Sequence, residues 1–276
     1  MHRKVGSTLV YGVFTRLPLS FLLLLTGATA YASPKQSECF ITMTLDSKHA
    51  SIGQSGSLCD EQIYAASTFK IPLALMVFDS GLLKDETSSF KWDGSKQPFP
   101  AWEQDQRVTS WLKYSVIWCS QQLTSKLGLA RIERYLKQWS YGNQDFSGGL
   151  TRAWLSSSLK ISAKEQVEFL RRLWRKELSS ATSAVEKTIA VLPKTDDTSN
   201  IVILGKTGTA FSWEDPSSSE GSESFQIGWY VGYFTKNKKP HSFAMVLKEP
   251  SKRGRFESVG NKARSRAIAL INEGRF

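Results

Sequence analysis

The sequence is poor in the residues that build disulfide scaffolds and metal sites. Its 276 residues include three cysteines and three histidines, and their spacing matches no zinc motif. Long apolar runs are also missing, because no segment after the N-terminal stretch approaches the roughly 18 apolar residues of a membrane-spanning helix. A composition of 41% hydrophobic and 22% charged residues argues against a disordered, collagen-like or coiled-coil chain. The length predicts one large globular domain or two interlocked lobes.

Residues 1–32 have the pattern of a secretory signal peptide. They contain three basic residues and no acidic one, a short apolar run at 17–25, and the small-residue sequence Ala-Tyr-Ala at 30–32. The apolar run is too short to span a bilayer as a stable helix. An uncleaved membrane anchor is the alternative. We predict cleavage, which leaves residues 33–276 as one exported unit in the periplasm, free of the membrane.

The formal charge of +11 first suggests a nucleic-acid partner. Three of these charges lie in residues 1–32, so +8 remains on residues 33–276. The remaining basic residues are scattered along the chain, and no recognition motif accompanies them. We therefore expect no nucleic-acid partner.

The order of the elements predicts an α+β fold. Alternating residues at 39–45 and 49–54 indicate a hairpin, and β-branched or aromatic runs indicate three strands near the C-terminus, at 201–205, 225–234 and 243–247. Helices are expected at 68–80, 121–139, 162–178 and 262–272. We predict a five-stranded antiparallel sheet assembled from both termini and flanked by helices, with a helical lobe inserted at about 85–195. The segment 217–224, rich in Ser, Glu and Gly, is expected to be a mobile loop.

The hairpin brings Cys59 back towards Cys39. An exported chain permits a disulfide between them, with Cys119 left as the unpaired thiol. Whether the two residues pair stays open, because the reach of residues 55–59 does not follow from sequence.

The pattern S-x-x-K occurs four times, beginning at Ser67, Ser88, Ser110 and Ser157. Ser67 differs from the others because it lies at the start of the apolar helix, where free backbone N–H groups and the helix dipole favour a developing anion. Lys70 lies one turn later on the same face, within reach of the Ser67 hydroxyl. The alternative is a simple helix cap followed by a solvated lysine.

A second motif, K-T-G at 206–208, continues a predicted strand, and Gly208 would let a ligand approach the backbone closely. S-x-x-K followed by K-T-G is typical of serine β-lactamases and penicillin-binding proteins. With S-V-I at 115–117, Y-G-N at 141–143 and W-L at 154–155, the sequence resembles the class D (oxacillinase-type) serine β-lactamases over nearly all of residues 33–276. The resemblance implies the serine β-lactamase and penicillin-binding-protein fold, β-lactams as small-molecule partners, and antibiotic resistance as the outcome.

The resemblance also implies that Lys70 is the base after carbon dioxide converts it to N6-carboxylysine, so carbon dioxide or bicarbonate is needed but no metal or other cofactor. Carbon dioxide attacks only a neutral amine, and burial lowers a lysine pKa. The Trp154 indole N–H can donate a hydrogen bond to the new carbamate. Core packing is the alternative role for this tryptophan.

Further roles follow from the resemblance. Ser67 attacks the lactam carbonyl, the backbone N–H groups of Ser67 and Thr209 hold the oxyanion, and Ser115 protonates the departing nitrogen. Lys206 supplies positive charge beside Ser115. The remaining residues expected to bind substrate are Thr207, Gly208, Ile117, Trp102 and Arg264.

Several alternatives remain open at this stage. Lys262 could replace Arg264 as the contact to the substrate carboxylate, Trp102 could be a packing residue, and Ile117 adds a methylene where the family usually has valine. A β-lactam sensor domain or a penicillin-binding protein that acylates without efficient turnover is the rival function. Neither the spectrum beyond penicillins nor the choice between monomer and homodimer follows from the sequence.

Overall fold

The computed structural model describes residues 37–46, 52–195, 201–212, 224–251 and 258–275. The predicted signal peptide at 1–32 lies outside the described residues, as do residues 49–51 of the predicted hairpin and most of the predicted loop at 217–224. Across the described ranges, no helix is long and apolar enough to cross a membrane.

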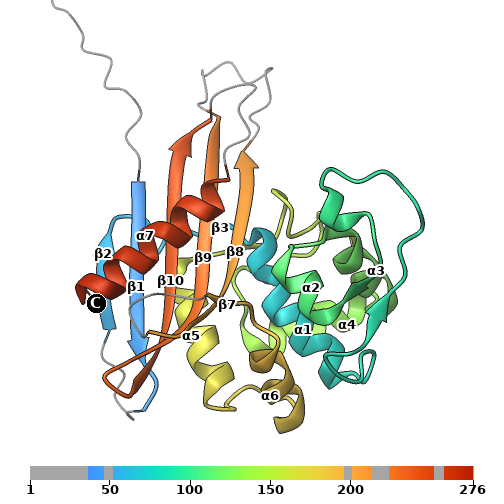
Figure 1. Ribbon diagram of the computed structural model, residues 1–276, viewed down its shortest axis with the longest axis horizontal. Coiled ribbons are helices and arrows are strands. Elements are labelled where there is room, and N and C mark those ends of the chain that lie inside the picture. The colour runs from blue at the N-terminus through green and yellow to red at the C-terminus, as the bar shows by residue number, and fades with distance from the viewer. Residues whose placement is uncertain (1–36, 47–51, 196–200, 213–223, 252–257, 276) are drawn as a thin grey trace, which may run out of the picture. The chain divides into compact units, whose positions relative to one another are not determined.

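The main sheet has six antiparallel strands in the order β2-β1-β10-β9-β8-β7 (Figure 1). The bounds are β1 (Ser37–Thr44), β2 (Ile52–Gly56), β7 (Lys194–Thr195), β8 (Ile203–Ser212), β9 (Phe225–Lys236) and β10 (Lys239–Pro250). The predicted count of five strands was wrong by one. The additional strand, β7, has only two residues and is too short to produce an alternating pattern. The hairpin is present, and its second strand, described from Ile52 to Gly56, extends two residues beyond the predicted end at 54.

Both faces of the sheet are covered by helices. Helix α5 (Ala163–Trp174) packs on β1, β9 and β10, and α7 (Val259–Glu273) packs on β8, β9 and β10 (Figure 1). Along β9 the large buried side chains alternate between the two cores, as a pleated strand requires: Trp229, Val231 and Tyr233 face the α5 side, whereas Tyr230 and Phe234 face α7. This alternation explains why β9 is an almost continuous hydrophobic run.

The helix bearing the S-x-x-K motif is buried on all sides. A 3-10 turn, η1 (Ala66–Phe69), leads directly into α1 (Lys70–Asp79), of which every residue from Lys70 to Phe78 is buried. The predicted single helix at 68–80 is therefore a 3-10 turn followed by an α-helix. Since α1 is apolar all round, it can only be the centre of a helical core.

The other predicted helices are present with shifted bounds. Residues 121–139 form two helices, α3 (Ile117–Leu127) and α4 (Leu129–Trp139), because Gly128 has a left-handed φ of 79° that interrupts the helix. A capping box formed by Ser162 and Glu165 begins α5. The remaining elements are η2 (Pro100–Trp102), α2 (Val108–Lys113), α6 (Thr182–Ala190) and the short strands β3 (Ile63–Tyr64), β4 (Ser89–Phe90), β5 (Gln106–Arg107) and β6 (Lys160–Ile161).

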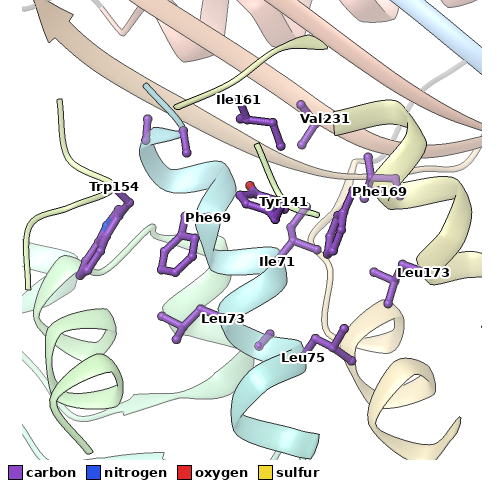
Figure 2. Close-up of a cluster of buried hydrophobic side chains, with 14 of the residues drawn as sticks. Phe69, Ile71, Leu73, Leu75, Tyr141, Trp154, Ile161, Phe169, Leu173 and Val231 are labelled. Atoms are coloured by element: carbon purple, nitrogen blue, oxygen red, sulfur yellow. The ribbon is translucent and has the colours of Figure 1, made fainter. Parts of the chain in front are cut away.

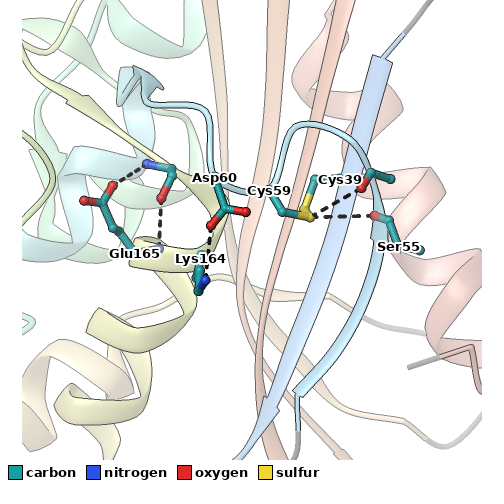
Figure 3. The surroundings of a disulfide bond; sticks show 8 residues. Cys39, Ser55, Cys59, Asp60, Lys164 and Glu165 are labelled. Carbon is teal, nitrogen blue, oxygen red and sulfur yellow. Dashed lines mark hydrogen bonds and ion pairs between the residues drawn. A yellow bond between two sulfur atoms is a disulfide. The ribbon is translucent and has the colours of Figure 1, made fainter.

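A disulfide joins Cys39 of β1 to Cys59, with the two Cα atoms 5.1 Å apart (Figure 3). Cys59 lies on the segment that connects β2 to η1. Two hydrogen bonds hold the same segment. The Ser57 amide donates to the Glu38 carbonyl at 3.0 Å, and the Lys164 amide donates to the Cys59 carbonyl at 3.1 Å. The disulfide therefore anchors the approach to Ser67 on the sheet. Cys119 is the free, buried cysteine.

We predict that replacing both Cys39 and Cys59 by alanine lowers the free energy of unfolding by about 3 kcal/mol, as expected for a crosslink that closes a loop of this length. The two cysteines are separated by 20 positions in the chain. Urea unfolding of the oxidised protein, the reduced protein and the double variant measures the effect. The reduced protein should match the variant, and equal stability in all three samples would contradict the prediction.

Candidate active site

Ser67 and Lys70 meet at the junction of η1 and α1. Ser67 is partly exposed, whereas Lys70 is completely buried. The Lys70 Nζ lies 3.3 Å from the Ser67 Oγ, so the sequence spacing does bring the amine to the hydroxyl. The turn is tight because Ala66 has a left-handed φ of 49°, which is uncommon for a residue with a side chain. The Ser67 hydroxyl therefore lies at a partly exposed position, whereas the Lys70 amine beside it is buried.

Burial lowers the pKa of Lys70 from 10.5 to about 7. A thiolate at Cys119 would act in the opposite direction, but burial raises the pKa of that thiol, so Cys119 is neutral at physiological pH. This electrostatic contact places Cys119, the free cysteine, near Lys70. A substantial fraction of Lys70 is therefore an uncharged amine near neutral pH.

Aromatic side chains pack around the residue that precedes Lys70. The Phe69 ring stacks on Trp154, with ring centroids 5.4 Å apart (Figure 2). The Phe146 ring packs against both, at centroid distances of 5.5 Å from Phe69 and 6.1 Å from Trp154. Trp154 is completely buried, yet its indole Nε1 has no hydrogen-bond partner within the described part of the chain. An unpaired buried N–H is costly, and a group bound next to it would remove that cost by accepting the hydrogen bond. Trp154 is thus both a packing residue and an unused donor.

The loop that carries Trp154 is closed at its base by the Y-G-N motif. Asn143 donates through Nδ2 to the Ser158 carbonyl at 2.8 Å and accepts at Oδ1 from the Lys160 amide at 3.0 Å. Gly142 has a φ of 53°, and a Cβ there would lie 2.1 Å from the Lys160 carbonyl oxygen, so no other residue fits. The motif therefore has a structural role, which is to hold the two ends of the loop together.

Ser115 and Lys206 form the opposite side of the site. Ser115 lies between α2 and α3 with a left-handed φ of 56°, and its hydroxyl accepts a hydrogen bond from the Lys206 ammonium. Lys206 also donates to the Thr207 carbonyl at 2.8 Å. Burial and the nearby charge of Lys70 lower the pKa of Lys206. Two buried lysines therefore flank Ser67 and Ser115, and a negative charge near them would favour the protonated form of each.

The K-T-G strand presents an open edge to Ser67. The Gly205 amide donates to the Pro193 carbonyl and the Phe211 amide donates to the Ser156 hydroxyl, so these amides point away from β9. Alternate residues of a strand share one edge, so the amide of Thr209, between them, points the same way. A Cβ on Gly208 would lie 3.3 Å from the Ser67 amide nitrogen. The geometry thus brings the two expected oxyanion donors, Ser67 and Thr209, to one place.

Helix α7 begins next to this strand. The Gly260 amide donates to the Thr209 hydroxyl at 3.1 Å, and a Cβ on Gly260 would lie 2.7 Å from the Gly208 carbonyl oxygen. Arg264 is exposed and pairs with no acidic residue in the described ranges. Burial raises the pKa of Tyr230, and the positive charge of Arg264 acts in the opposite direction, so the two residues are near each other. Tyr230 lies directly opposite Thr207 in the β8–β9 ladder, so Arg264 and the K-T-G strand have this tyrosine as a common neighbour.

Lys262 forms an ion pair with Glu249 at 2.9 Å. Arg264 is therefore the better placed of the two basic residues to receive an anion.

Two of the residues predicted to bind substrate, Trp102 and Ile117, are wholly or partly buried. Trp102 is buried, and its indole donates to the Tyr114 carbonyl at 2.8 Å, so it supports the backbone next to Ser115. Ile117 is half-buried at the first position of α3.

Sequence reasoning missed Ser156, Gly260 and Phe211, because their contacts depend on backbone positions that no local pattern records. No cluster of three metal-ligating His, Cys, Asp or Glu side chains occurs among the described residues.

Comparison with known proteins agrees with the geometry. Residues 29–269 match the family described as "Penicillin binding protein transpeptidase domain". The chain is 36% identical to the β-lactamase OXA-1 of Escherichia coli, an alignment that covers 85% of this chain and 83% of the relative. The crystal structure of the OXA-427 class D β-lactamase is 34% identical with a TM-score of 0.72, covering 86% of this chain and 98% of that one. The C-terminal domain of the Bacillus licheniformis BlaR penicillin-receptor is 28% identical with a TM-score of 0.73, covering 87% and 92%.

We predict that the buried amine of Lys70 makes stability depend on pH. Its pKa is about 7 in the folded chain, against the ordinary lysine value of 10.5. The unfolded chain therefore binds more protons between these values, and the free energy of unfolding rises with pH across this window. In CO₂-free buffer, Lys70→Met should be more stable than the wild type by about 5 kcal/mol below pH 7.

This gain should shrink as the pH rises towards 10.5, the value for the free amine. Urea unfolding at several pH values measures it. A difference between Lys70→Met and the wild type that stays constant from about pH 6 to about pH 10 would contradict burial as the cause.

Proposed function

Since the chain belongs to the penicillin-binding-protein transpeptidase family and, within it, to the class D serine β-lactamases, we propose that it hydrolyses penicillin-type antibiotics with N-carboxylated Lys70 as the general base. The observation that carries this proposal is the buried Lys70 amine with a pKa of about 7, 3.3 Å from the Ser67 hydroxyl. Export by residues 1–32 to the periplasm would place this activity where it confers resistance.

The residues around Lys70 suit carboxylation. A neutral amine can attack carbon dioxide, forming one N–C bond and releasing one proton, and burial of Lys70 makes that neutral form available. The unpaired Trp154 N–H is a donor for one carboxylate oxygen. Carboxylation replaces the positive charge of Lys70, one of the two causes that lower the pKa of Lys206, by a negative one, so it favours a protonated Lys206 beside the anion. The carboxylate on Lys70 supplies the base for both steps of hydrolysis, acylation and deacylation.

The reaction then follows from the residues in place. Ser67 loses its proton to the base and its oxygen attacks the lactam carbonyl, while the Ser67 and Thr209 amides hold the oxyanion. The C–N bond of the lactam breaks, and Ser115 transfers a proton to the departing nitrogen. Lys206, hydrogen-bonded to Ser115, replaces the proton that this hydroxyl gives up, and the proton held by the base then returns to Lys206.

Deacylation uses the base a second time. Water gives a proton to the base as its oxygen attacks the acyl carbonyl, the ester C–O bond breaks, and the Ser67 oxygen takes that proton back from the base.

The substrate carboxylate has matching charges at the edge of the site. Thr207 is partly exposed on the K-T-G strand, and Arg264 lies near the residue opposite it. A guanidinium is well suited to a carboxylate because it can form two parallel hydrogen bonds. We assign the carboxylate contact to these two side chains.

A β-lactam sensor is the second candidate, favoured by the likeness to the penicillin-receptor domain. A sensor would form the same acyl-enzyme on Ser67 without releasing it. The two functions therefore differ in deacylation, which a turnover measurement separates.

We predict that the protein hydrolyses many equivalents of oxacillin per chain. Mild acid treatment should lower this activity because protonation of the carbamate nitrogen releases carbon dioxide, and added bicarbonate should restore it. Absorbance of the lactam measures turnover. One equivalent of stable acyl-enzyme without further hydrolysis would favour the sensor instead.

We predict distinct defects for the base and its donor. Lys70→Ala should lower the acylation rate by two or more orders of magnitude, because no base remains. Trp154→Phe keeps an aromatic ring but removes the N–H, so half-maximal activity should require about tenfold more bicarbonate. Steady-state rates over a bicarbonate series measure both. Persistent turnover by Lys70→Ala would contradict the proposed base.

A further inference from the structure

Ser156 makes a long-range contact that none of the assigned roles uses. It lies two residues after Trp154, and its hydroxyl accepts a hydrogen bond from the Phe211 amide at 2.9 Å. The two residues are 55 positions apart in the chain. The contact therefore joins the loop that carries Trp154 to the far end of the K-T-G strand.

The backbone at Ser156 is in a conformation that needs support. Its φ of 44° lies in the left-handed region, which a residue with a side chain adopts at a cost of about 1 kcal/mol or more. Such a conformation persists where surrounding contacts hold it. The hydrogen bond to Phe211 is a contact of this kind.

The loop that carries Trp154 is held at two places, at its base and at Ser156. Asn143 closes its base through Ser158 and Lys160. The Ser156 hydroxyl joins the other side of the loop to β8. Its partner, the Phe211 amide, lies on the same open edge of β8 as the Thr209 amide, two residues further along the strand. The loop and the oxyanion strand are thus connected directly.

We propose that Ser156 is a positioning residue that holds the Trp154 loop against β8 and thereby keeps the Trp154 indole N–H aligned with the carboxylate on Lys70. This inference rests on the proposed carboxylation of Lys70. Loss of the hydroxyl frees the loop from the strand, and the carboxylated form becomes less stable relative to the free amine. The acylating groups themselves stay in place.

Three variants test this role. Ser156→Ala removes the acceptor, and Ser156→Asn keeps one on a residue that tolerates the left-handed conformation. Ser157→Ala is the matched control, because no hydrogen bond joins Ser157 to β8 among the described residues. The readouts are the bicarbonate concentration for half-maximal oxacillin hydrolysis, kcat at saturating bicarbonate, and hydrogen exchange at the Phe211 amide. A thermal melt shows that each variant is folded.

We expect Ser156→Ala to need about fivefold more bicarbonate, which corresponds to the loss of one ordinary hydrogen bond. Its kcat at saturating bicarbonate should stay near that of the wild type, and its Phe211 amide should exchange about tenfold faster. Ser156→Asn and Ser157→Ala should resemble the wild type in all three readouts.

Two results would overturn the proposal. One is an unchanged bicarbonate requirement in Ser156→Ala, whatever the exchange rate at Phe211. The other is a Ser156→Asn variant that is as defective as Ser156→Ala. A wild-type enzyme whose activity never depends on bicarbonate would instead overturn the carboxylation of Lys70 itself, so the two failures are distinguishable.

Discussion

Burial of the Lys70 amine is the constraint on which the rest of the site depends. Lowering the pKa of Lys70 from 10.5 to about 7 corresponds to about 5 kcal/mol of disfavoured charge, which the fold must offset elsewhere. The buried apolar residues of helix α1 provide this stabilisation, and the packing of the Phe69 ring against Trp154 closes one side of the site. The same burial that destabilises the ammonium produces a nucleophilic amine at neutral pH. Function and stability therefore oppose each other at this residue.

The neighbouring features become intelligible from this constraint. Trp154 leaves its indole N–H unpaired, and Lys206 holds a second amine close enough for the charge of Lys70 to lower its pKa. Both features are costly by themselves, and both become favourable once Lys70 carries a carboxylate. The Ser67 hydroxyl accepts a hydrogen bond from Lys70, and the Ser115 hydroxyl accepts one from Lys206.

Much of this arrangement followed from the sequence, because its signals are local. The spacing of Ser67 and Lys70 predicted their contact, and the resemblance to the serine β-lactamases implied the fold that places the K-T-G strand beside the helix. The antiparallel sheet assembled from both termini had a clear signal in its alternating and β-branched runs. The two-residue strand β7 and the break at Gly128 were missed, since neither alters the hydrophobic period. The Ser156 contact could not be predicted, because it depends on a left-handed backbone and a partner 55 positions away.

The most direct test is ¹³C nuclear magnetic resonance of the enzyme equilibrated with ¹³C-bicarbonate near neutral pH. The proposed mechanism predicts one carbamate signal per chain in the wild type. The signal should be absent from Lys70→Ala, and it should disappear on acidification together with the activity. Full oxacillin turnover by a wild-type sample that shows no carbamate signal would contradict the central claim that carboxylated Lys70 is the base.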